Sequence, residues 1–563
     1  MGSVGTARLC ARAIRATEAR LLTPAATPHA RGQLILRYAA NAYALRVRTL
    51  LNMSTRSSAR TTIANAIRHV RDNANGHSRN SPSHWASRPW PVACAAVLLS
   101  LAFFFTVLPN LGTIFWDYDE GWMILGGRSV LRGLRPFVDF AHHEPPLHLF
   151  LLALSARGFG DTVVGYRLLS LCSIALGGVM MFALAYPLVG ALGALIAEAA
   201  FMYSPAQLRA LTAVPETPAL LLGLSGAVVL FHGRLRASAY ASGALFALGL
   251  MTKPTSVAIA IAAVVGLGYA RQWGRIGQLA VAAVATVLLG VASIDLLSHG
   301  AFGDVLRFQL NRLTTRNVGM WTIDSGFVEM RRTLGIATPT ELAWHYLKDL
   351  YLFPWIFLPL SLLGASFLGI PFVVAEGRMD QPALTVFLVS WPLSCLALNM
   401  FVLDFAPARY FIPLTASSAL LLAGPVPVVC RRIGWGITAV LVATFVLTFA
   451  LNFRSALNTF RDPWYYSHAQ AIIDAHPRVV SFSPMLFAVT GADPGCGFAN
   501  PALTYGAFGD VLASALGTRR FQVSDKQLIK CLKANPAVPL VVDWAFFFFT
   551  RPASSLRRYL ETA

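Results

Sequence analysis

Long uncharged runs, separated by short polar connections, fill most of the chain between residues 89 and 453. A helix that crosses a bilayer needs about 20 mostly apolar residues. One or two such runs could be core helices, but about eleven indicate an all-α polytopic membrane bundle. The predicted spans are Pro91–Phe115, Val164–Leu188, Ala191–Pro205, Thr217–His232, Ala237–Thr252, Thr255–Ala270, Ile276–Leu297, Tyr351–Ala375, Pro382–Leu403, Tyr410–Cys430 and Ile433–Phe453.

Two further helices are predicted between the first and second spans. Gly121–Leu134 combines apolar Trp122 and Ile124 with Arg128, a pattern typical of a helix that lies in the membrane interface. Pro146–Gly160 is apolar but only about 15 residues long, which suits an interfacial or re-entrant helix better than a span. We therefore expect extracytoplasmic interfacial helices in this loop.

The segment 1–88 differs in composition from the rest of the chain. It carries many Arg residues but only two acids, Glu18 and Asp72. Such a stretch is typical of a transit peptide, of a disordered cytoplasmic arm, or of sequence upstream of a later start such as Met53. Under each interpretation its charge favours a cytoplasmic N-terminus.

Residues 454–563 lose the long apolar runs and predict a small extracytoplasmic α/β domain. Helical patterns cover Ser467–Ala475 and Lys526–Ala534, and strand patterns cover Arg478–Ser483 and Val538–Asp543. The segment has no Gly-rich phosphate loop, so an accessory role is expected. The predicted domains are therefore the arm 1–88, the transmembrane domain 89–453 and the domain 454–563.

Charged residues are scarce, and their placement predicts the topology. They make up 13% of the chain, against about a quarter in soluble proteins. The net charge of +20 would suggest nucleic acid binding in a soluble protein. Here the basic residues lie between hydrophobic runs, as they do in cytoplasmic loops, so no nucleic acid partner is expected. The predicted cytoplasmic connections contain Arg234, Arg236, Arg271, Arg275, Arg378, Arg431 and Arg432.

With these loops inside, four regions face outward from a bacterial inner membrane. They are the first loop 116–163, the loop 207–216, the loop 298–350 and the C-terminal residues 454–563. The cysteines show no CxxC spacing, and Cys496 and Cys531 could pair if the C-terminal region is oxidised.

Several chemically active residues fall in these outward regions. Trp116–Gly121 contains three carboxylates, among them Asp119 and Glu120. Acids at a membrane boundary are costly unless they are solvated or used, and taken alone the motif is better explained by a solvated helix start. The segment 139–148 holds three His, two acids and two Pro. Its His and carboxylate groups could hold a divalent metal, but no ligand spacing repeats, and a rigid, polar, substrate-facing turn is preferred.

Three isolated groups lie at the outer ends of later spans. Glu216 could be a helix N-terminal acid, Lys253 could extend to the lipid headgroups, and Arg409 could pair with a nearby acid. The predicted topology nevertheless places them in the compartment of the first-loop acids. Carboxylates can take a proton from a hydroxyl nucleophile, and Lys and Arg can hold a leaving phosphate. This combination favours chemistry at the outer interface.

These motifs, in this order, resemble those of the GT-C membrane glycosyltransferases. The closest look-alikes are the protein O-mannosyltransferases and the lipid A aminoarabinose transferase. Asp119-Glu120 resembles their acidic motif after the first span, and Glu216 falls where they carry a second loop acid. Glu144-Pro145-Pro146-Leu147 resembles their Lys-Pro-Pro-Leu, Thr252-Lys253-Pro254 resembles Thr-Lys-Gly, and Arg409-Tyr410-Phe411-Ile412-Pro413 resembles Arg-Tyr-Leu-Leu-Pro. The resemblance runs from Pro91 to about Phe453.

The resemblance implies transfer of a sugar from a polyprenyl-phosphate donor to a hydroxyl on a lipid, glycan or protein acceptor. Asp119 would be the base or would orient the acceptor, and no cofactor is firmly implied. Glu144 departs from the family, because it replaces the Lys before Pro-Pro and removes a phosphate contact. The other implied roles are site shaping by Glu120 and Glu216, phosphate binding by Lys253 and Arg409 with Arg312 or Arg316, substrate binding by Tyr410, and compensation for Glu144 by His142 or His143.

Three other classes of protein share some of these features. A secondary transporter also has many spans, but its polar residues lie near the bilayer midplane in repeated halves, and no internal repeat is visible. A lipid flippase or an O-antigen-type ligase would share the polyprenyl substrate. A non-catalytic assembly protein of the same fold would keep the spans without the chemistry.

Overall fold

The structure is a computed structural model that describes residues 89–306, 381–398, 412–496 and 523–541, with short gaps inside these ranges, and residues 555, 556 and 559. Residues 90–563 belong to one compact unit. The predicted arm 1–88 and the predicted span Tyr351–Ala375 lie outside the described residues.

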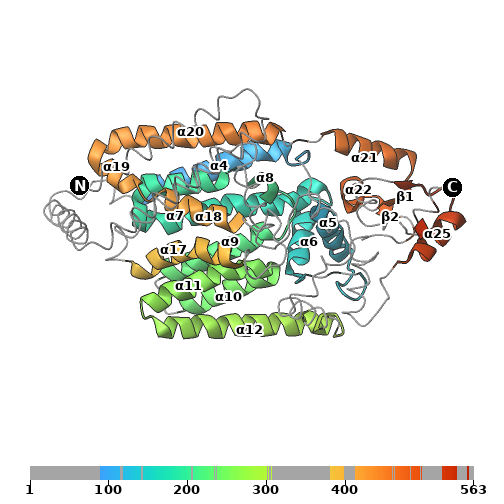
Figure 1. The fold of residues 1–563 in the computed structure, drawn as a ribbon, viewed down its shortest axis with the longest axis horizontal. Coiled ribbons are helices and arrows are strands. Elements are labelled where there is room, and N and C mark those ends of the chain that lie inside the picture. The colour runs from blue at the N-terminus through green and yellow to red at the C-terminus, as the bar shows by residue number, and fades with distance from the viewer. Residues whose placement is uncertain are drawn as a thin grey trace, which may run out of the picture. The chain divides into compact units, whose positions relative to one another are not determined.

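Every other predicted span contains a helix (Figure 1). These helices are well formed because their sequences are rich in Leu, Ala and Val and almost free of charge, so their backbone groups must bond within the helix where water is absent. They are α4 (Pro89–Val107), α7 (Val163–Met202), α9 (Glu216–His232), α10 (Ser238–Thr252), α11 (Val257–Tyr269), α12 (Trp273–Leu297), α17 (Pro382–Ala397), α18 (Ile412–Leu422), α19 (Val426–Ile433) and α20 (Trp435–Thr459).

The helices present apolar surface that water would not tolerate. Within the described ranges, five segments are long and apolar enough to cross a membrane. On α12, Leu288 and Leu289 are 62% and 69% exposed. Only 6% of the most apolar stretch of this helix is buried. Contiguous exposed apolar faces of this kind mark contact with lipid or with a partner. The chain is therefore a helical membrane protein, and the total of eleven spans stays a prediction.

α7 is one element by hydrogen bonding but two helices in space. Forty residues of helix would be about 60 Å long, twice the thickness of the bilayer core. At Gly190 the backbone leaves the helical region, with φ 68° and ψ −176°. A Cβ atom on Gly178, twelve residues before the break, would lie 2.5 Å from the sulfur of Met202, twelve residues after it. The two halves are thus antiparallel, as the two predicted spans require.

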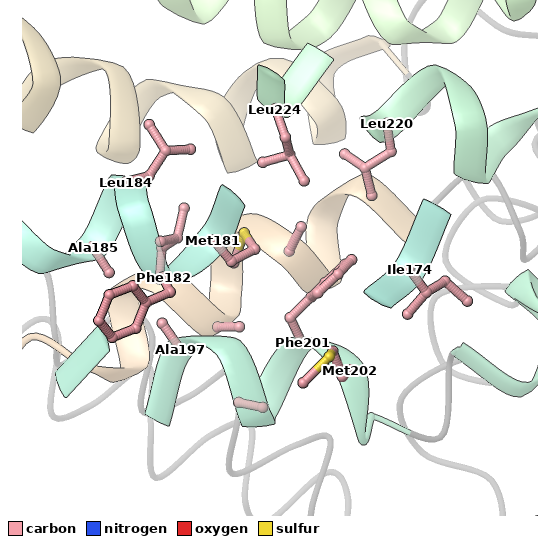
Figure 2. Packing of buried hydrophobic residues seen from close by; sticks show 14 of the residues in the cluster. Ile174, Met181, Phe182, Leu184, Ala185, Ala197, Phe201, Met202, Leu220 and Leu224 are labelled. Atoms are coloured by element: carbon pink, nitrogen blue, oxygen red, sulfur yellow. The ribbon is translucent and has the colours of Figure 1, made fainter. Parts of the chain in front are cut away.

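The centre of the bundle is built around this hairpin. Met181 and Phe182 of the first half pack with Ala197 and Phe201 of the second half, and α9 adds further leucines to the same cluster (Figure 2). Close approach elsewhere depends on small residues, which let helix backbones meet in a membrane. A Cβ atom on Gly243 of α10 would lie 2.3 Å from a backbone oxygen of α12, and the same holds for Gly266 of α11 against α17.

The two helices predicted in the first loop are both present. α5 (Tyr118–Leu131) and α6 (Leu147–Phe159) pack against each other, and α6 also packs against α7. Their contact has little space to spare, because a Cβ atom on Gly126 would lie 2.9 Å from the side chain of Leu149. α5 carries the acidic motif in its first turn, so this packing fixes where the acids point.

The described part of the C-terminal region contains the helices and strands that its sequence predicts, and two elements more. A parallel sheet in the order β2-β1-β3 is flanked by helices. Cys496 and Cys531 form a disulfide, which answers the question that the sequence left open. The elements are α21 (Pro463–Ala475), β1 (Arg478–Ser481), α22 (Pro484–Thr490), β2 (Asp493–Pro494), α25 (Asp525–Ala534) and β3 (Leu540–Val541), of which α22 and β2 were not predicted.

The C-terminal region packs directly on the first loop. Arg128 of α5 donates to the backbone oxygens of Phe487 and Ala488 at the end of α22, at 2.9 and 3.2 Å. A guanidinium in this position satisfies helix C-terminal carbonyls. The same side chain pairs with Asp161 at 2.8 Å. α22 therefore braces the helix that carries Asp119 and Glu120.

Replacing Gly121 with Ala should loosen this brace. A Cβ atom at Gly121 would lie 2.5 Å from the backbone nitrogen of Met485, and backbone cannot move aside as a flexible side chain can. Overpacking of this kind costs about 1–3 kcal/mol, so the thermal midpoint of the purified protein should fall. Gly158→Ala on α6 is the matched control, since its Cβ atom would meet nothing within 4 Å. Equal midpoints for the two variants would contradict the packing of α22 on α5.

Candidate functional site

The acidic motif of α5 is anchored by a buried ion pair. Arg167 of α7 donates from Nε and Nη2 to the two oxygens of Glu120, at 2.6 and 2.7 Å, and both side chains are fully buried. Its remaining Nη1 donates to the carbonyl oxygens of Leu111 and Ile114. A forked guanidinium on a carboxylate fixes both distance and orientation. Glu120 therefore locks α5 to α7.

A single peptide unit connects Glu120 to the next part of the site. The backbone nitrogen of Ala213 donates to Glu120 Oε1 at 2.8 Å. The carbonyl oxygen of Ala213 lies 3.1 Å from Nε2 of His148. Burial lowers the pKa of His148 to about 4, although its bond to Ala213 and the charge of Glu144 oppose this shift. The ring is neutral at pH 7, and its Nε2–H donates to the carbonyl.

Three of the predicted site residues meet around one ammonium group. Lys253 Nζ is hydrogen-bonded to Glu144 Oε1 and lies 3.6 Å from Glu216 Oε1. The Lys253 side chain is 3% exposed, which excludes its extension to the lipid headgroups. We call these three residues the Lys253 cluster. It contains two acids and one base, so its formal charge is −1.

Local sequence explains how each member of the Lys253 cluster is held. Lys253 is the C-cap of α10 and has extended backbone angles, because the following Pro254 disfavours a helical conformation. Glu216 is the first residue of α9, where the helix dipole favours an acid. Glu144 lies in the Pro-Pro turn before α6. The start of α9, the end of α10 and the turn before α6, which are far apart in sequence, thus meet at the Lys253 cluster.

A small cavity lies next to the Lys253 cluster. Its walls come from α9, α11, α17 and α18, and Glu216 lines it together with Ser256 and Trp391. Its volume of about 10 Å³ is close to that of one water molecule. Among the described residues, the hydroxyl of Ser256 has no hydrogen-bond partner, and the indole nitrogen of Trp391 bonds to no nitrogen or oxygen. The cavity offers polar groups to a small ligand beside a carboxylate.

Asp119 differs from its neighbour Glu120 in accessibility. It lies in the first turn of α5 and is partly exposed, whereas Glu120 is fully buried and its two oxygens are occupied. Of the two acids, Asp119 is the one that is accessible to solvent. The ion pair of Glu120 holds it in place through the intervening peptide bond.

Five of the predicted site residues lie outside the described part of the chain. They are His143, Arg312, Arg316, Arg409 and Tyr410, so their roles stay predictions. In the described ranges, no group of three His, Cys, Asp or Glu residues is placed to hold a metal ion. The metal hypothesis for the segment 139–148 also stays untested, since His143 belongs to it.

In the sequence, Arg167 was missed and His148 was placed only in the polar segment 139–148. Arg167 lies near the start of a span, and His148 lies in the apolar helix α6. A charge inside an apolar run is a sign of function or of a buried partner, so Arg167 carried a usable signal. For His148 the only sequence signal was its place in the polar segment 139–148.

The fold is similar to that of two proteins of known structure. No family model and no curated protein matches the sequence. ArnT from Cupriavidus metallidurans in the apo state has a TM-score of 0.51 at 15% identity, over 73% of this chain and 86% of that one. The archaeal oligosaccharyltransferase AglB from Archaeoglobus fulgidus, in complex with an inhibitory peptide and a dolichol-phosphate, has a TM-score of 0.50 at 12% identity, over 77% and 69%. The chain thus has a GT-C-type glycosyltransferase fold, as its motifs predict.

Proposed function

We propose that this protein is a membrane glycosyltransferase that moves a sugar from a polyprenyl-phosphate donor to a hydroxyl group on a lipid, glycan or protein. The single observation that carries the proposal is the Lys253 cluster, which stands beside the anchored acidic motif on a GT-C-type fold. AglB was solved with a dolichol-phosphate, a lipid of the proposed donor class. The reaction takes place at the extracytoplasmic face.

The transfer step uses the two parts of the site in complementary roles. The acceptor oxygen attacks the anomeric carbon, the bond from that carbon to the phosphate oxygen breaks, and polyprenyl phosphate leaves. The carboxylate of Asp119 takes the proton of the acceptor hydroxyl. Lys253 meets the negative charge that develops on the leaving phosphate, and Arg409 adds a second cation.

The Lys253 cluster implies an exchange of partners when the donor binds. In the structure Glu144 holds the ammonium group that the phosphate needs. A phosphate oxygen can replace one carboxylate at Lys253 only if Glu144 turns away or takes up a proton. Glu216, buried at the start of α9, stays and keeps Lys253 in position. Glu144 stands where the GT-C membrane glycosyltransferases carry a Lys. It therefore competes with the phosphate for the ammonium group of Lys253.

Replacing Glu144 with Gln should tighten binding of polyprenyl phosphate. The substitution removes one negative charge beside Lys253 and keeps the shape of the side chain. A charge interaction at about 4 Å is worth about 1 kcal/mol in water and more where the effective dielectric constant is lower. We expect the dissociation constant for detergent-solubilised polyprenyl phosphate to fall about 5- to 10-fold. Tryptophan fluorescence or calorimetry on the purified full chain would measure it.

Lys253→Gln is the opposing variant and should weaken the same binding by at least the same factor. Asp161→Asn is the control, because this acid pairs with Arg128 and not with Lys253. Unchanged affinity in both Glu144→Gln and Lys253→Gln would show that the cluster does not bind phosphate. A transporter or a scaffold would also show donor binding without any transfer, which the rate measurements on Asp119 distinguish.

A further inference from the structure

A carboxyl group that plays no part in the proposed reaction is buried in the middle of the helix bundle. Glu198 lies in the second half of α7 and has no exposed surface. Its neighbours along the chain, Ala197 and Ala199, are fully buried as well. The sequence around it, Ala191–Pro205, is otherwise free of charge. Acids at such positions are rare in membrane helices and call for an explanation.

No positive charge compensates Glu198 in the described part of the chain. None of the ion pairs there includes it. Oε1 has one neighbour, the hydroxyl of Ser100 on α4 at 2.8 Å, and Oε2 has no hydrogen-bond partner among the described residues. Glu120, by contrast, has a guanidinium on both oxygens. An ionised carboxylate buried with a single neutral hydrogen bond would cost many kcal/mol, and such groups hold a proton instead.

The hydroxyl of Ser100 gives a second reason to expect that Glu198 carries a proton. Its oxygen lies 3.0 Å from the carbonyl oxygen of Ala175 in the first half of α7, and 2.8 Å from Glu198 Oε1. A hydroxyl has one hydrogen to donate and can accept a bond on its lone pairs. If Ser100 donates to Ala175, the short contact with Oε1 is favourable only when Glu198 is the donor. One added proton then satisfies both contacts.

We propose that Glu198 is a proton-binding site, whose carboxylic acid donates to Ser100, which in turn donates to the carbonyl of Ala175. This chain joins α4 to both halves of α7. Gly178 provides the space for it, because a Cβ atom there would lie 3.1 Å from the Ser100 hydroxyl and 2.5 Å from Met202. Tyr203, a titratable group that interacts electrostatically with Glu198, contributes no positive charge. The proposal does not depend on the glycosyl transfer.

The position of this proton site connects it to the acidic motif. Ala175 lies eight residues after Arg167 on the same helix, about 12 Å along its axis. Ser100 lies on the helix that leads into Leu111 and Ile114, whose carbonyls accept from Arg167. The protonated carboxyl therefore holds α4 against α7, the helix that carries Arg167.

Infrared spectroscopy of the full-length protein in detergent tests the proposal directly. The carbonyl stretch of a protonated acid is separate from the two carboxylate bands. The spectrum of the wild type minus that of Glu198→Gln at pH 7 should show the acid band and no carboxylate bands. Asp474→Asn, an exposed acid on α21, is the matched control and should show carboxylate bands alone. If the difference for Glu198→Gln shows only carboxylate bands, the side chain is ionised and the proposal is wrong.

A second variant keeps the test decisive if Glu198→Gln does not fold. In Ser100→Ala the acid stays protonated but loses its acceptor, so its band should remain and move to the frequency of a free acid. An acid band that is unchanged in Ser100→Ala would contradict the hydrogen bond to Ser100. Loss of the band in Ser100→Ala would equally contradict the proposal, because burial without a cation would then not suffice to keep the proton.

Discussion

Replacing Asp119 with Asn should reduce the rate of sugar transfer roughly 10²- to 10⁴-fold, the usual contribution of a general base. The amide keeps the size of the side chain but cannot take the proton of the acceptor hydroxyl. The fold should be unaffected, because Glu120 and Arg128 anchor α5 and both contacts remain in the variant. The rate would be measured as turnover of the polyprenyl-phosphate sugar in membranes that contain equal amounts of each variant.

Two comparisons separate a chemical effect of Asp119 from a structural one. Asp474→Asn carries the same substitution on an exposed helix position and should retain the full rate. Glu120→Gln should lower the thermal midpoint, because it leaves the guanidinium of Arg167 without its charge partner. If Asp119→Asn and Glu216→Gln both transfer sugar at the wild-type rate, the catalytic assignment is wrong.

Replacing Arg167 with Met should destabilise the protein by about 3–5 kcal/mol. The substitution leaves the carboxylate of Glu120 buried without its cation, and the carbonyls of Leu111 and Ile114 lose a donor. Breaking one side of a fully buried pair costs far more than the pair itself contributes, because the remaining charge stays desolvated. Thermal or denaturant unfolding in detergent would measure the loss, together with a sharp fall in the yield of folded protein.

The loss of stability in Arg167→Met should arise from the unpaired carboxylate of Glu120 and not from the removal of an arginine alone. Arg157→Met removes an exposed arginine from α6, so the change in unfolding free energy should stay within about 0.5 kcal/mol. The double variant Glu120→Leu/Arg167→Met should recover much of the stability, since an apolar pair can replace a buried ion pair. A double variant as unstable as the single one would show that the helices do not depend on this pair as described.

The sequence predicted the helices well because their physical cause is local. An uncharged run of sufficient length must hydrogen-bond within itself in a bilayer, whatever its neighbours are. The same reasoning placed Glu144, Glu216 and Lys253 in one compartment, and the structure brings them into contact. Residues at the ends of antiparallel helices meet by topology alone, so their grouping follows from the order of the spans.

The pairing within the site could not be predicted, because it depends on packing between distant segments. Glu120 pairs with Arg167 of another helix. Arg128 bonds to Phe487 of α22, which is 359 residues away in the sequence. Nothing near Glu120 in the sequence shows that a buried guanidinium neutralises it. No local pattern indicates that Glu144 holds Lys253 either. A helix N-terminal acid and a site residue look the same until the partner is known.

Lipid analysis of a strain that lacks the protein decides whether the chain consumes a polyprenyl-phosphate sugar. Lipids would be extracted from the deletion strain and from the same strain carrying the wild type or Asp119→Asn. We expect a polyprenyl-phosphate sugar to accumulate in the deletion strain and with Asp119→Asn, and to return to its basal amount with the wild type. Unchanged polyprenyl-phosphate sugars in all three strains would contradict a transferase that uses such a donor.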